Sequence, residues 1–117
     1  MTTMSVTPFG VMFSDHATRR AQQRGIRPAV VDFVLRNADR DLEAGNGCRA
    51  YRISKKGLAE LLSHGAKVGE VALATNVVVI LHEDSGEVIT VMHDRNKAGR
   101  RYRRQWSTWS GAQKHIA

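Results

Sequence analysis

Residues 77–92 constrain the fold more than any other stretch of the sequence, because two runs of β-branched and other apolar residues flank a short turn. The runs cover residues 77–81 and 88–92, and the turn sequence Glu-Asp-Ser-Gly occupies residues 83–86. This pattern predicts a β-hairpin in which Gly86 adopts the positive φ that a tight turn requires. Because the first run is apolar on both faces, we expect it to form a central strand that is covered on both sides.

Two helices are predicted ahead of the hairpin. The first covers residues 15–24, with Ser14 as its N-cap and Gly25 as its C-terminal stop. The second covers residues 28–37 and opens with a proline, which suits the first turn of a helix. The apolar residues of this second helix fall on one face, so we expect it to pack on the core.

The pattern changes several times between the second helix and the hairpin. The polar, glycine-bearing residues 39–47 predict a loop, and the alternating residues 48–53 predict a strand. A third helix is expected at residues 55–64, followed by a loop at residues 65–69. Residues 71–74 fit either a short strand or a helical turn.

The chain of 117 residues is long enough for one compact domain. We predict a single α+β domain, in which two N-terminal helices pack on a small, mainly antiparallel sheet of three or four strands with one inserted helix. Residues 1–12 are expected to be frayed, although the alternation of Phe9, Val11 and Phe13 fits a short edge strand or an anchor. Residues 95–117 are expected to form a basic tail.

Composition excludes several classes of protein. The hydrophobic content of 42% argues against wholesale disorder, and no apolar run approaches the roughly 20 residues of a membrane span. The N-terminus lacks the basic and apolar regions of a secretory signal. The single Cys48 cannot form an internal disulfide, which fits a reducing compartment and leaves a secreted effector open. We therefore expect a cytoplasmic protein with no membrane partner.

Positive charge is concentrated at two places in the chain. Residues 1–94 contain 11 Lys/Arg and 11 Asp/Glu, so the seven basic residues that follow carry the whole net charge of +7. Residues 16–27 contain four Arg and no carboxylate. Two basic patches predict a polyanionic partner, with nucleic acid as the first expectation. The alternative is a solvated helix face and a solvated tail.

The strongest local motif occupies residues 14–26 and has the form S-x-H-A-x-x-R-x-x-x-R-G-I. Together with the second helix and the hairpin, it resembles a family of small uncharacterised bacterial domains over about residues 13–94. The layout of N-terminal helices followed by an antiparallel sheet also resembles the RelE/ParE-type toxins and the barnase-like and EndoU-like ribonucleases, although the helix predicted at residues 55–64 is longer than we expect for that layout. The resemblance implies a metal-independent ribonuclease of a toxin–antitoxin pair.

The chemistry of such a reaction can be compared with the residues present. RNA cleavage without a metal ion needs a base for the 2′-hydroxyl proton, an acid for the leaving oxygen, and cations around the phosphorane charge. Histidine suits the acid and base roles, and arginine can contact phosphate through two bonds at once. We assign catalytic roles to His16, to Arg20 one helical turn later, and to His93. The predicted nucleic-acid-binding residues are the other cations of the first helix and the tail: Arg19, Arg24, Arg95, Lys97, Arg100, Arg101, Arg103 and Arg104.

A metal site has little support, and no cofactor is predicted. The nearest set of ligands would be His16, His82 and His93, but no spacing supports it. His82 lies next to the predicted turn, so it should sit at the far end of the hairpin from His93.

Two other functions remain open. The chain fits a nucleic-acid-binding module without catalysis, because phosphate contacts alone give salt-dependent binding. It also fits an interaction protein whose basic tail docks an acidic partner, and that partner could be an antitoxin. The tail residues Trp106 and Trp109 are expected to dock on the body, with stacking on bases as the alternative.

Overall fold

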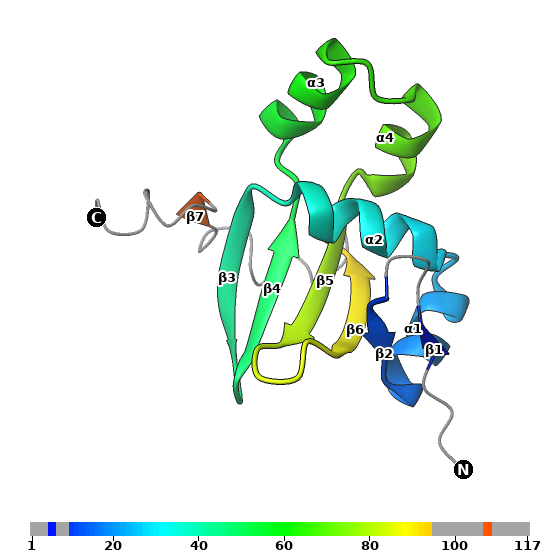
Figure 1. Ribbon diagram of the computed structural model, residues 1–117, viewed down its shortest axis with the longest axis vertical. Coiled ribbons are helices and arrows are strands. Elements are labelled where there is room, and N and C mark those ends of the chain that lie inside the picture. The colour runs from blue at the N-terminus through cyan, green and yellow to red at the C-terminus, as the bar shows by residue number, and fades with distance from the viewer. Residues whose placement is uncertain (1–4, 7–9, 95–106, 109–117) are drawn as a thin grey trace.

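The computed structural model describes residues 5–6, 10–94 and 107–108 of the chain. Within them the fold is α+β, as predicted, and the strands form one sheet in the order β1-β2-β6-β5-β4-β3-β7 (Figure 1). The elements in chain order are β1 (Ser5–Val6), β2 (Met12–Phe13), α1 (Asp15–Gln23), α2 (Pro28–Asn37), β3 (Arg40–Gly45), β4 (Cys48–Arg52), α3 (Lys55–Ser63), α4 (Val68–Ala74), β5 (Val77–His82), β6 (Val88–His93) and β7 (Ser107–Thr108).

The predicted hairpin is confirmed as β5 and β6, and it forms the centre of the sheet. The two strands pair antiparallel, with Val77 opposite His93 and Leu81 opposite Val88. Gly86 in the turn has a φ of +72°, in the region that favours glycine. The first four residues of β5 are all buried, so the central strand is covered on both sides as expected.

Three short strands extend the antiparallel core formed by β3 to β6. β2 contains Phe13, the last of the alternating residues near the N-terminus, and it pairs in parallel with β6 at Phe13 and Val88. β1 pairs antiparallel with β2, and β7 pairs antiparallel with β3. The four long strands thus match the predicted sheet of three or four strands, and the short strands are additions to it.

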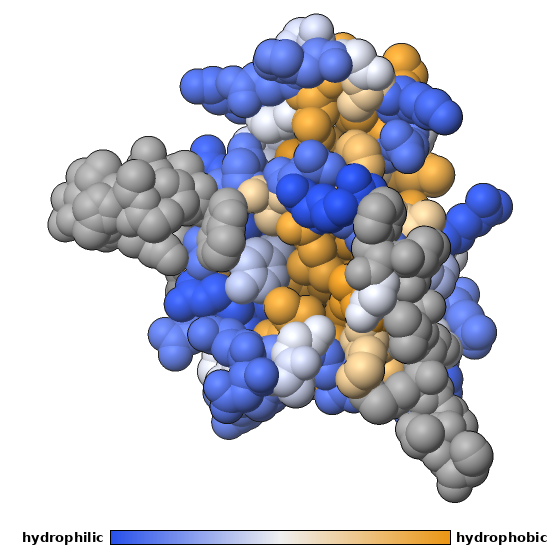
Figure 2. Space-filling model, in the orientation of Figure 1, coloured by the Kyte–Doolittle hydropathy of each residue, from blue (hydrophilic) through white to orange (hydrophobic). Residues whose placement is uncertain are grey.

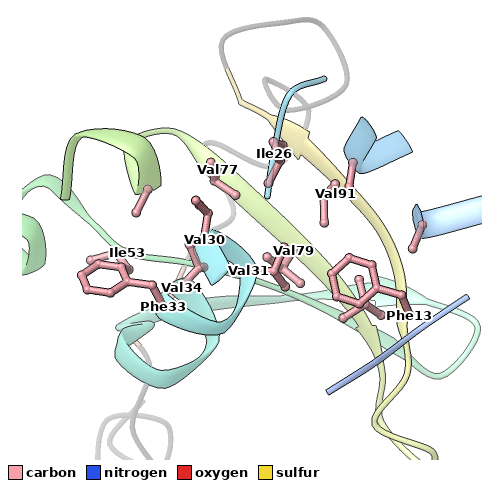
Figure 3. Packing of buried hydrophobic residues seen from close by; sticks show 14 of the residues in the cluster. Phe13, Ile26, Val30, Val31, Phe33, Val34, Ile53, Val77, Val79 and Val91 are labelled. Carbon is pink, nitrogen blue, oxygen red and sulfur yellow. The ribbon is translucent and has the colours of Figure 1, made fainter. Parts of the chain in front are cut away.

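Apolar residues are buried on both faces of the sheet. On one face, α2 crosses the strands, and its Val31 lies near Val79 of β5 (Figure 3). This cluster also contains Ala17 and Ala21 of α1. A second cluster lies on the opposite face, and the described helices contribute no residue to it: Leu42, Ala50, Val78, Ile80 and Met92. The two N-terminal helices therefore share one side of the sheet.

The loop predicted at residues 39–47 is wrong, because most of this segment forms β3. Leu42 and Ala44 belong to the second apolar cluster. Asp41 lies on the other face, where its carboxylate accepts a hydrogen bond from Arg49 of β4. The charged residues gave the segment the composition of a loop. In the structure the acidic residues alternate with the apolar residues along β3, so the two kinds face opposite sides of the sheet. A cross-strand ion pair accounts for the buried carboxylate.

The inserted segment contains two helices instead of the one predicted. α3 begins after Ser54, whose hydroxyl accepts a hydrogen bond from Gly57 N at 3.0 Å. α4 starts inside the expected loop at residues 65–69 and includes residues 71–74, which are helical rather than extended. A helix of seven residues spans two turns, which is too short to show a clear sequence period. Both helices project beyond the end of the sheet where β4 ends and β5 begins (Figure 1).

Gly57 of α3 is held tightly by the network that caps this helix. The Asp39 carboxylate accepts hydrogen bonds from the backbone N and the hydroxyl of Ser54, both at 2.6 Å. A Cβ atom at position 57 would lie 2.5 Å from Asp39 Oδ2 and 3.1 Å from Ile53 Cγ2. Only glycine therefore allows this approach of α3 to the carboxylate.

We expect Gly57→Ala to lower the free energy of unfolding by about 1–2 kcal/mol, because displacement of Asp39 outweighs the gain in helix propensity. The matched control is Gly69→Ala in α4, where an added Cβ meets no other described atom within 4 Å. That substitution is expected to raise the free energy by about 0.5 kcal/mol. Urea denaturation measures both, and a stabilising effect of Gly57→Ala would contradict the close packing.

Candidate nucleic-acid interface on helix α1

The orientation of α1 is fixed by its N-cap and by two small residues. The Ser14 hydroxyl accepts a hydrogen bond from Ala17 N at 3.0 Å, and Ser14 N donates to the carbonyl of Val88 in β6 at 3.0 Å. Ala17 and Ala21 are buried, so the helix lies close against the sheet. The opposite side of α1 is consequently turned to solvent, and it carries Arg19, with the exposed His16 and the half-buried Arg20 beside it.

The structure brings His16 and Arg20 together on the exposed side of α1. Arg20 Nε donates to His16 Nε2 at 3.4 Å, and Arg20 Nη1 donates to Gln23 Oε1 at 3.0 Å. These bonds use two of the five N–H groups of the guanidinium. They also require an unprotonated Nε2 on His16, which is the form of imidazole that accepts a proton. The i, i+4 spacing seen in the sequence thus corresponds to a direct contact.

The other two predicted arginines of α1 differ in their surroundings. Arg19 is exposed beside His16 and Arg20 on the helix surface. Arg24 is half-buried, and its Nη1 donates to the carbonyl of Val91 in β6. Arg24 therefore tethers the C-terminal end of α1 to the sheet, in addition to any contact with a phosphate. The sequence did not predict this tethering role of Arg24, because the role depends on a contact between residues far apart in the sequence.

His93 is not brought to His16. It ends β6 opposite Val77, whereas the start of α1 is bonded to Val88 at the beginning of that strand. Five residues of extended chain span about 16 Å, so the two histidines lie at opposite ends of β6. His82 lies at the turn end of β5 and is also remote from His93, as predicted.

A charged cluster on the helix-bearing face of the sheet was not predicted as a unit. Arg49 Nη1 donates to Asp41 Oδ2 at 2.6 Å, and Arg49 Nε donates to Glu83 Oε2 at 3.3 Å. Tyr51 lies directly opposite Asp41 in the pairing of β3 with β4. Arg49 and Tyr51 share β4, whereas Asp41 lies in β3 and Glu83 follows β5. The cross-strand register, which sequence patterns do not provide, is what joins them.

Burial and charge affect the titration of this cluster. Burial raises the pKa of Tyr51, and the carboxylates of Asp41 and Glu83 raise it further against the opposing effect of Arg49. Burial acts to lower the pKa of Arg49, but Asp41 and Glu83 outweigh it, so that pKa is raised. Tyr51 stays protonated and Arg49 stays charged at neutral pH. The cluster therefore sets two carboxylates against one cation, so it offers no net positive charge to a phosphate.

The predicted tail contacts lie outside the described residues: Arg95, Lys97, Arg100, Arg101, Arg103, Arg104, Trp106 and Trp109. The described part of the tail, β7, pairs with Arg40 and Asp41 of β3 and so joins the edge of the sheet. In residues 10–94 no group of three or more His, Cys, Asp and Glu side chains is arranged to hold a metal ion. The described helices also include none with the length and apolar character needed to cross a membrane.

Comparison with protein-family models, with curated proteins and with solved structures finds no match to this chain.

Proposed function

We propose that this protein is a metal-independent ribonuclease of the toxin type, and that the exposed side of α1 contacts its RNA substrate. The supporting observation is the contact between Arg20 Nε and His16 Nε2 at 3.4 Å on a solvent-facing helix surface. It pairs a group able to accept a proton with a cation able to bind phosphate. Arg19 adds an exposed cation on the same helix, next to the half-buried Arg20.

In the proposed reaction His16 acts as the general base. Arg20 Nε first releases His16 Nε2, whose freed lone pair takes the proton of a 2′-hydroxyl. The resulting oxygen attacks the adjacent phosphorus. The bond from phosphorus to the 5′-oxygen breaks, which leaves a 2′,3′-cyclic phosphate and a 5′-hydroxyl. Arg20 places the N–H donors that Gln23 does not hold, including the released Nε–H, against the phosphorane oxygens, where negative charge develops. Because His93 lies at the other end of β6, water supplies the proton to the leaving oxygen in this scheme.

We expect expression of the wild-type chain in a bacterium to arrest growth, and His16→Ala or Arg20→Ala to remove that effect. The matched control is Gln22→Ala. Gln22 is exposed on the same helix but lies about 120° around its axis from His16. Growth curves and protein levels are measured together, so that loss of toxicity is not mistaken for loss of protein. Equal toxicity of wild type and both site variants would contradict the proposal.

A non-catalytic RNA-binding module is the second candidate. The separation of His93 from His16 favours it, because the described surface of α1 then offers one acid/base group instead of two. Under this alternative, binding is salt-dependent and survives the loss of His16. An acidic antitoxin partner belongs to the first proposal and is not required by the second.

A further inference from the structure

An apolar surface on the inserted helices is open to solvent. Val68 and Leu73 of α4 are 73% and 56% exposed, and Leu62 of α3 is 41% exposed. These are three of the four large hydrophobic residues that are exposed among the residues described. Figure 2 shows apolar side chains at the surface over α3 and α4, where the helices project from the sheet. Of these three side chains, Leu73 lines a pocket, and an exposed apolar side chain beside a pocket is suited to anchor a partner.

A pocket of about 110 Å³ lies next to this surface, between α2 and α4. Ala29, Val30 and Phe33 of α2 form one wall, and Leu73 of α4 forms part of the other. Arg27 and Glu70 also line the pocket. Its interior is thus apolar, and its margin carries one charge of each sign. We call the pocket, together with the exposed side chain of Leu73 that lines it, the α2–α4 patch.

The charges of the α2–α4 patch indicate what kind of surface it complements. Arg27 and Glu70 form no salt bridge among the described residues. A two-fold symmetric contact places the same patch on both sides, so each surface must be complementary to itself. A patch with both signs at its margin and apolar side chains at its centre meets this condition. The exposed side of α1 meets it less well, because helix α1 contains two arginines and a single carboxylate, Asp15.

We propose that the α2–α4 patch is a homodimer interface, in which each copy receives an apolar side chain of α4 from the other. Arg27 of each copy then faces Glu70 of the other copy, and both ion pairs form across the symmetry axis. The interface uses none of the residues assigned to RNA binding. Dimerisation and the proposed ribonuclease activity can therefore be tested independently of each other.

Sedimentation of the full chain over a range of protein concentrations tests this proposal first. The wild type is expected to sediment as a dimer that dissociates on dilution. Leu73→Glu is expected to weaken self-association by about tenfold or more, because an apolar anchor is lost from the centre of the contact. The control Gln22→Glu adds the same charge at an exposed site on α1 and leaves the dimer intact. A monomeric wild type at high concentration, or a Leu73→Glu variant that still dimerises like wild type, would overturn the proposal.

Charge reversal tests the symmetry of the contact. Arg27→Glu and Glu70→Arg each place like charges against one another in both halves of a two-fold interface, so each variant alone is expected to be monomeric. Mixing the two variants restores opposite charges at both positions, and a heterodimer is expected. A charge effect within one chain would not be rescued by mixing. Thermal melting of each variant checks that the fold is retained, and failure of the mixture of folded variants to associate contradicts the two-fold arrangement.

Discussion

Replacing Arg49 by methionine is expected to lower the free energy of unfolding by about 2–3 kcal/mol. The carboxylate of Asp41 is fully buried, with 0% exposure, and Arg49 binds it at 2.6 Å. Removal of the cation leaves a buried negative charge without its ion-pair partner. The expected loss falls below the roughly 3–5 kcal/mol typical of a fully buried pair, because the Arg49 side chain is 27% exposed and Asp41 makes a further interaction.

The double variant Arg49→Met/Asp41→Leu separates the loss of the pair from the loss of packing. It removes both charges, so we expect it to recover most of the stability lost in the single variant. Lys56→Met is the matched control, since it removes an exposed cation at the start of α3 and should change the free energy by less than about 0.5 kcal/mol. Urea denaturation measures all three. Equal losses in the single and double variants would show that the ion pair is not what stabilises Asp41.

Much of the fold follows from local sequence signals. The hairpin was predictable because two β-branched runs flank a glycine turn. α1 was predictable from its N-cap and its C-terminal glycine, and α2 from its first-turn proline and its apolar face. β3 was missed because Asp41 and its neighbouring charges resemble a loop until a partner strand supplies Arg49. The parallel pairing of β2 with β6 at Phe13 and Val88 was not predictable, since it joins residues 75 positions apart.

The candidate site was predictable to a similar extent. The contact between His16 and Arg20 follows from their spacing on one helix, so sequence alone located it. The tether from Arg24 to Val91 and the distance of His93 from His16 depend on how α1 lies along β6. That arrangement is set by the packing of Ala17 and Ala21 and by the bond from Ser14 to Val88, which no local pattern shows.

Removing the imidazole of His16 is expected to lower the rate of RNA cleavage by about 100- to 10,000-fold, the range that general base catalysis contributes. The effect should fall on the chemical step, because RNA affinity depends mainly on the cations. His64→Ala is the matched control, since His64 is an exposed histidine at the end of α3, on a different part of the molecule. It should cleave like wild type. A similar loss in both variants would indicate a general effect on the protein.

The central claim is tested most directly by incubating the purified protein with total RNA in the presence of EDTA. The account predicts discrete cleavage products with wild type, cyclic phosphate at their 3′ ends, and no products with His16→Ala, which should still bind RNA. Cleavage by His16→Ala at the wild-type rate would remove His16 from the site. RNA binding that salt reverses, without cleavage by the wild type, would contradict the ribonuclease proposal and favour the binding module.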